Sequence, residues 1–244
     1  MEISILLAEQ ILAMFLTMAV GFGVVRAGLF KTEDSRIISN MVVYICNPCV
    51  VVHSFQIELT DDKIKGLMIA IGLSVVVHMV LIIGSEILSF IFHFNSIEKA
   101  SIIYTNAGYL VIPLVGAVLG EEWVFYTTAF ILVQTVLMWT HGVKLIGQEK
   151  ELNIRKILCN PNVIAMIIGI ALFALEIRLP TVVDSCVSGF GDMISPASMM
   201  VIGMVIGDVD LKWVFRQKRP YLICLLRLIV FPLIAVVAFA GLER

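Results

Sequence analysis

The chain has little charge and no polar segment long enough to form a separate soluble domain. Asp, Glu, Lys and Arg together make up 15% of its 244 residues, whereas hydrophobic residues make up 60%. A typical soluble domain has about 25% charged residues, so this composition excludes that class. The net charge of −2 is close to neutral, and the sequence has no basic patch of the kind that binds nucleic acid. These absences favour a protein whose surroundings are a lipid bilayer.

The sequence also lacks the motifs of membrane-embedded enzymes and of metal sites. It contains no H-E-x-x-H sequence and no Asp-rich diphosphate motif. Glu121 and Glu122 match the start of the E-E-x-x-x-R motif of intramembrane CAAX-type proteases, but Tyr126 stands where that motif needs Arg. Cys46 and Cys49 form one C-x-x-C, which redox or metal chemistry can use. Because no second pair exists, we interpret them as small packing residues, and we expect no enzymatic activity, cofactor or metal.

What the sequence does contain is eight hydrophobic stretches, each long enough to cross a bilayer at about 20 residues per helix. Such continuous runs indicate helices, because barrel strands are shorter and alternate polar with apolar residues. The first run lacks the basic lead-in of a signal peptide, since only Glu2 precedes it. We therefore expect an all-α, polytopic membrane protein. The stretches lie near residues 3–25, 37–57, 67–92, 100–119, 123–143, 157–177, 182–207 and 219–241.

Lys and Arg are distributed unequally between the connections. The connections after stretches 2, 4 and 6 hold only Lys63, Lys65 and Arg178. Cytoplasmic loops of membrane proteins carry an excess of Lys and Arg, so we expect the other connections in the cytoplasm, the N-terminus outside, and the chain in the cell membrane. Those after stretches 1, 3, 5 and 7 hold Arg26, Lys31, Arg36, Lys99, Lys144, Lys150, Arg155, Lys156, Lys212, Arg216, Lys218 and Arg219.

A weak internal repeat divides the chain after its fifth hydrophobic stretch. An odd number of crossings separates the two copies, so the second enters the membrane from the opposite side, as in many secondary transporters. We expect residues 1–150 to form a first five-helix repeat and 151–244 a partial second, with helices 6–8. A complete second unit would give about 305 residues, so helices 9 and 10 are expected to be missing. The matching residues are Ala13-Met14, Arg26, Asp34-Ser35 and Pro48, and then Ala165-Met166, Arg178, Asp184-Ser185 and Pro196.

The middle of the fourth stretch contains residues that disfavour a continuous helix. Pro113 has no N–H to give to the carbonyl of Tyr109, four residues back, and Gly108 permits non-helical backbone. Asn106 adds an amide that both donates and accepts hydrogen bonds. A helix broken here would expose a half-helix N-terminus, whose positive end attracts an anionic group. A simple proline kink remains the alternative.

Prolines in the second and seventh stretches occupy corresponding places in the two repeats. Pro48 follows Asn47, and Pro196 follows Ser195. Each proline removes one helical hydrogen bond, and the neighbouring Asn or Ser side chain can bond to the freed groups. We expect helix breaks at both places, next to the site in the fourth stretch.

Other polar residues in the stretches have competing interpretations. Gln134 either binds substrate or makes a hydrogen bond between helices. Arg227 either attracts a substrate carboxylate or pairs within the protein, for which Glu86 is a candidate partner. His53 and His78, with His141, titrate in the range that proton coupling needs, although such histidines are more often hydrogen-bonded packing residues.

Several motifs together resemble the auxin efflux carrier family, which includes bacterial malate and malonate permeases. The pattern Asn-x-Gly-x-x-x-x-Pro in the fourth stretch carries the resemblance, and Val111 departs from it because a small residue is usual there. The resemblance implies ten helices in two inverted five-helix repeats, with helices 4 and 9 broken and crossing at the substrate site. It also suggests a homodimer. The other matching motifs are Asn160-Pro161, Ser195-Pro196 with Gly203, and Arg227 with Pro232.

The expected function is therefore secondary transport of a small organic anion, such as malate or malonate, by alternating access at the broken helix. The expected substrate-binding residues are Asn106, Gly108, Tyr109, Pro113 and Gln134. A sodium-coupled relative of the bile-acid symporters and a non-transporting sensor or remnant are the alternatives. The sequence leaves open the substrate, the driving ion and the direction of transport.

Overall fold

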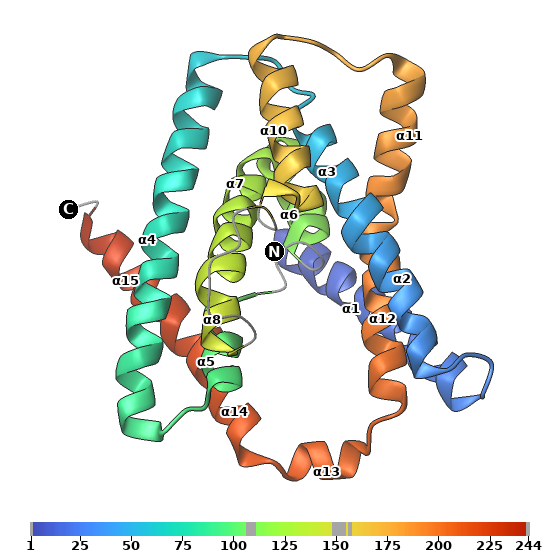
Figure 1. The fold of residues 1–244 in the computed structure, drawn as a ribbon, viewed down its shortest axis with the longest axis vertical. Coiled ribbons are helices and arrows are strands. Elements are labelled where there is room, and N and C mark those ends of the chain that lie inside the picture. The colour runs from blue at the N-terminus through green and yellow to red at the C-terminus, as the bar shows by residue number, and fades with distance from the viewer. Residues whose placement is uncertain (1, 106–110, 148–154, 156–157, 243–244) are drawn as a thin grey trace.

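The computed structural model describes residues 2–105, 111–147, 155 and 158–242, and in these ranges the regular structure is entirely helical (Figure 1). Six helices in the described ranges are long and apolar enough to cross a membrane: Ser4–Arg26, Thr32–Ser54, Asp61–Phe92, Glu122–Leu145, Thr181–Gly207 and Lys218–Val236. Each corresponds to one of the expected hydrophobic stretches. The stretch at 157–177 forms a shorter apolar helix, Pro161–Ala174, and the stretch at 100–119 is divided into two helices. The all-α polytopic class is confirmed.

The helices follow one another in the order of the hydrophobic stretches. In the described ranges, π-helical turns occur at η2, η4 and η5. The elements are α1 (Glu2–Arg26), η1 (Thr32–Asp34), α2 (Ser35–Met41), η2 (Val42–Cys46), α3 (Asn47–Ser54), α4 (Asp61–Phe92), α5 (Ser96–Ile103), α6 (Ile112–Leu119), α7 (Glu121–Leu137), η4 (Met138–Gly142), α8 (Val143–Leu145), α10 (Pro161–Ala174), α11 (Thr181–Asp192), α12 (Ile194–Gly207), α13 (Leu211–Arg216), α14 (Lys218–Leu225), η5 (Leu226–Val230) and α15 (Phe231–Leu242).

Local sequence signals explain where several helices begin. The side chain of Thr60 accepts a hydrogen bond from the Lys63 N–H, at 3.3 Å, at the start of α4. Asn95 and Glu98 form a reciprocal capping box at the start of α5, with bonds of 2.8 and 2.9 Å. Such caps satisfy N–H groups that have no partner within the helix. The local sequence therefore sets the start of α4, which is the third stretch, and the start of α5, which follows it.

The connections of the two charge classes lie at opposite ends of the helices (Figure 1). The connection between α3 and α4 and the one between α10 and α11 are at the top of the view. The connection between α4 and α5, together with the short helix α13, is at the bottom. The basic connections after the third and seventh stretches therefore share one end of the molecule.

Helices α1 and α12 pack with their backbones in direct contact. A Cβ atom built on Gly203 would lie 2.0 Å from the carbonyl oxygen of Met18, and one built on Gly21 would lie 2.2 Å from that of Met200. Small residues at helix interfaces allow this close approach in membranes, where packing rather than the hydrophobic effect drives helix association. Glycine is therefore required at both positions.

An aromatic cluster joins α3, α7 and α10. The rings of Phe55 and Phe125 have centroids 5.1 Å apart in an edge-on arrangement, and Phe173 lies 5.3 Å from Phe125. All three side chains are buried. In contrast, α1 and α4 expose many large apolar side chains, which suits surfaces in contact with lipid. The cluster fixes α7 beside α3, while α7 also contacts α4.

The prediction of a helix break at Pro48 was wrong. Backbone angles stay in the right-handed helical region from η2 into α3, and the helix widens into the π-helical turn that ends two residues before Pro48. A π turn shifts the hydrogen-bond pattern, so the missing N–H and the bulky ring are accommodated without an interruption. Near Pro196 the helix does change: Met193 separates α11 from α12, three residues before the proline.

Candidate functional site

The fourth hydrophobic stretch is discontinuous, as predicted. Helix α5 ends at Ile103, and Tyr104 has extended backbone angles of φ −95° and ψ 134°. The next helix, α6, begins at Ile112 with Pro113 in its first turn, where a missing N–H removes no helical bond. The predicted substrate residues Asn106, Gly108 and Tyr109 lie outside the described residues. The two ends of the interruption are described, and they define the candidate site.

Arg227 binds the carbonyl end of α5. Its Nη1 atom donates to the carbonyl oxygens of Ile102, at 3.0 Å, and Tyr104, at 2.7 Å, and also to that of Ser101. The last carbonyls of a helix have no partner within the helix and carry a partial negative charge. Arg227 comes from η5, 123 residues further along the chain than Tyr104. A positive charge from the eighth stretch therefore holds the end of the broken helix.

Gln134 holds the first residue beyond that end. Its Nε2 donates to the Thr105 carbonyl oxygen at 2.8 Å, and its Oε1 accepts from the Thr105 N–H at 3.0 Å. Gln134 lies on α7 and is 8% exposed. The amide thus supplies both hydrogen bonds that Thr105 loses by leaving the helix, which is what buried backbone groups in a membrane require. Of the two interpretations of Gln134, the geometry shows a hydrogen bond between elements.

Tyr104 anchors the segment that follows α5 through contacts with the end of α7 and with η4. Its hydroxyl lies 3.0 Å from the Leu137 carbonyl oxygen and 2.8 Å from Nδ1 of His141. A Cβ on Gly142 would lie 3.0 Å from the Tyr104 ring, so the ring rests on the backbone of the π turn η4. Sequence reasoning missed this pair. The signal that could have found it was a histidine and a glycine adjacent to each other, facing the broken stretch.

Glu86 and Arg227 do not pair with each other. The Glu86 carboxylate lies 2.7 Å from Nζ of Lys99, across the connection between α4 and α5. Arg227 is occupied by the carbonyls described above. The expected pairing of Glu86 with Arg227 is therefore wrong. The internal repeat indicates only that the two residues occupy equivalent positions on two helices, whereas a salt bridge also depends on which ends of the helices meet.

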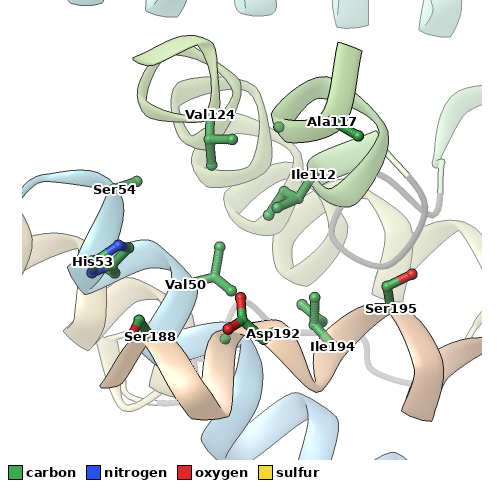
Figure 2. Close-up of a pocket in the computed structure, with 12 residues that line it drawn as sticks. Val50, His53, Ser54, Ile112, Ala117, Val124, Ser188, Asp192, Ile194 and Ser195 are labelled. Carbon is green, nitrogen blue, oxygen red and sulfur yellow. The ribbon is translucent and has the colours of Figure 1, made fainter. Parts of the chain in front are cut away.

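A cavity of about 250 Å³ lies on the other side of the interruption, between α6 and the helices of the second and seventh stretches (Figure 2). Its apolar walls include Val50, Ile112 and Val124. Ser195, predicted to flank the site, lines it together with Asp192. The start of α6 borders the cavity, and helix N-termini carry partial positive charge, whereas the Asp192 carboxylate adds a negative charge to the lining. The remaining lining residues are His53, Ser54, Gly116, Ala117, Ser188, Gly191 and Ile194.

A hydrogen-bonded pair of side chains that sequence reasoning did not find connects the helices beside this cavity. Nδ1 of His53 lies 3.0 Å from the Asp184 carboxylate, which joins α3 to α11. Both side chains are more than one-third exposed. Figure 2 places His53 at one end of the cavity and Ser195 at the other. The pair fixes the separation of the two helices that form the cavity floor.

Asn47 and Pro48 lie near the cavity but do not line it. Asn47 is 5% exposed, and its Oδ1 atom has no hydrogen-bond partner among the described residues. Pro48 is in the first turn of α3, and Pro196 is in the first turn of α12. Within the described part of the chain, no group of three or more His, Cys, Asp or Glu residues could hold a metal ion.

The comparison with protein families identifies the chain. A family model described as a membrane transport protein matches residues 6–153 and 148–243, which together cover nearly the whole sequence. No curated protein matches the chain. The chain therefore belongs to the membrane transport protein family, of the auxin efflux carrier type, and is a multi-pass membrane protein.

Proposed function

We propose that this protein is a secondary transporter that moves a small organic anion, such as malate or malonate, across the cell membrane. Family membership supports transport. The observation that supports the site is the interruption of the fourth stretch, where Arg227 and Gln134 hold the end of α5 and the start of α6 borders a cavity. A transporter of this kind needs no enzymatic chemistry and no cofactor.

The size of the cavity supports a small substrate, and the helix N-terminus at the interruption supports an anionic one. Pockets for drug-sized ligands measure about 300–1,000 Å³, so a cavity of about 250 Å³ suits a smaller molecule. The half-helix that begins at Ile112 points its positive end at the interruption. Asn106 would complete the site with an amide donor, as the family resemblance implies, beside Gly108, Tyr109 and Pro113.

Alternating access would arise from movement between two groups of helices. The first contains α1, α3, α10, α11 and α12, which contact one another, and the second contains α4, α5, α14 and α15. The substrate site lies where the two groups meet, at α6 and α7. We place the N-terminus outside and expect residues 1–150 and 151–244 to form inverted repeats, each of which contributes helices to both groups. We also expect a homodimer formed through the first group.

The test is uptake by the full chain in liposomes. Radiolabelled malonate or malate should enter vesicles containing the protein, and Asn106→Ala should lower the uptake rate at least tenfold. Asn40→Ala, an exposed asparagine on α2, serves as the matched control and should retain the rate. Absence of uptake and exchange for every small carboxylate tested would refute the proposal. Uptake that occurs only with sodium would favour the symporter alternative.

A further inference from the structure

A buried histidine near the interruption has one ring nitrogen without a partner. His78 on α4 is 0% exposed, and its Nδ1 lies 2.7 Å from the carbonyl oxygen of Ser74. A carbonyl oxygen only accepts hydrogen bonds, so Nδ1 carries the proton and Nε2 is left with a lone pair. Nε2 has no hydrogen-bond partner among the described residues. Unpaired buried polar atoms are uncommon and call for an explanation.

The position of His78 connects it to the interruption. Its ring packs on Phe130 of α7, with centroids 4.7 Å apart. Gln134 lies one helical turn further along α7, on the same face as Phe130. This is the amide that holds the backbone of Thr105. A proton added at Nε2 would therefore compete with Thr105 for Gln134.

Among the residues that the structure describes, few charged groups lie around His78. On α4 its bonded neighbour is Ser74, which does not ionise in this range, and α7 presents Phe130 and the uncharged Gln134. The eighth stretch contributes the Arg227 guanidinium. The ionic groups of α5 and α14, Glu98, Lys99 and Arg219, lie at the far end of α4 with Glu86.

We propose that His78 is the proton-binding site through which this protein couples the entry of one carboxylate to the entry of one proton. The inference rests on the proposed function and adds its driving ion. In the empty site, no anion lies at the interruption to balance a positive charge on the His78 ring. A carboxylate bound at the interruption offsets that charge, so anion and proton favour each other's binding. This linkage is reciprocal and typically amounts to about 5- to 150-fold in affinity.

Protonation also has a mechanical consequence. The new N–H at Nε2 needs an acceptor, and the neighbouring acceptor is Oε1 of Gln134. When Gln134 turns to it, the Thr105 N–H loses its bond. One of the two bonds that hold Thr105 beyond the end of α5 is then lost only when the site is loaded, which suits a coupled change of access.

The experiment uses the full chain in liposomes with radiolabelled malonate under two conditions. One is exchange of internal for external malonate at equal pH, and the other is accumulation driven by an acidic exterior. His78→Asn keeps a donor near Ser74 but cannot take up a proton. It should lose accumulation, and any exchange that remains should not depend on pH. His93→Asn is the matched control on α4, because His93 is exposed and has positive φ, which Asn tolerates. It should accumulate like the wild type.

The outcomes separate this inference from the proposed function. A wild-type protein that neither exchanges nor accumulates malonate refutes the transport proposal itself. A wild type that exchanges malonate but ignores the pH gradient overturns only the inference, as does a His78→Asn variant that accumulates normally. If that variant does not fold, His78→Gln replaces it. If neither variant folds, the deciding measurement is proton uptake by the wild-type protein in detergent when malonate is added, followed with a pH indicator. Without coupling, no proton uptake would be observed, and the inference would be overturned.

Discussion

Replacing Gln134 by leucine tests whether this residue holds the backbone or binds the substrate. The change keeps the approximate size of the side chain and removes both bonds to Thr105, of 2.8 and 3.0 Å. A buried polar group left without a partner costs about 1–3 kcal/mol, while hydrogen bonds between membrane helices average about 0.6 kcal/mol. The two bonds together therefore contribute about 1–6 kcal/mol.

The assay is thermal unfolding of the purified protein in detergent. One kcal/mol lowers Tm by about 2–4 °C for a chain of 150–250 residues, so a loss of about 2 kcal/mol predicts a decrease of about 4–8 °C. The Tm of the Gln134→Glu variant should fall less, because one carboxylate oxygen still accepts from the Thr105 N–H. Gln10→Leu, on α1, is the control and should leave Tm within about 1 °C. An unchanged Tm for Gln134→Leu combined with lost malonate affinity would refute the structural role.

Two further predictions concern helix contacts. Gly203→Val should abolish the folded, monodisperse protein in size-exclusion chromatography, because even the Cβ atom would overlap the backbone of α1, whereas Gly72→Ala should fold normally, since a Cβ there meets no atom within 4 Å. Arg227→Met should lower malonate uptake at least tenfold and Tm by several degrees, because it leaves three carbonyls of the α5 end unpaired. Arg227→Lys should retain part of the uptake and part of the Tm, since Lys keeps the positive charge but has one donor centre instead of a planar fork. Equal losses in the Met and Lys variants would mean that the positive charge at the helix end contributes nothing.

Features that depend on local sequence were predictable. The hydrophobic stretches identified the membrane-spanning segments, because a bilayer imposes a length and a composition on each segment by itself. The interruption of the fourth stretch was predicted from Pro113 and Gly108, since the missing N–H and the permissive backbone act within one turn. The all-α class followed from the same local rules.

Local rules misjudged the second stretch. Pro48 was expected to break the helix, but a π turn from Val42 to Cys46 accommodates it. The same arrangement occurs in the eighth stretch, where η5 ends two residues before Pro232. Whether a proline breaks a helix or widens it depends on the packing of the neighbouring helices, and the sequence of one segment does not contain that information.

The sequence by itself determined that this is a helical membrane protein with an irregular fourth segment, because hydropathy and proline chemistry are properties of short stretches. Only the tertiary structure decided which side chains complete the irregular segment. Arg227 and Gln134 were both singled out as polar residues in apolar surroundings, but their partners are backbone atoms of Tyr104 and Thr105. Those partners are set by how α7 and η5 meet the end of α5, since a membrane offers no water to satisfy these groups in any other way.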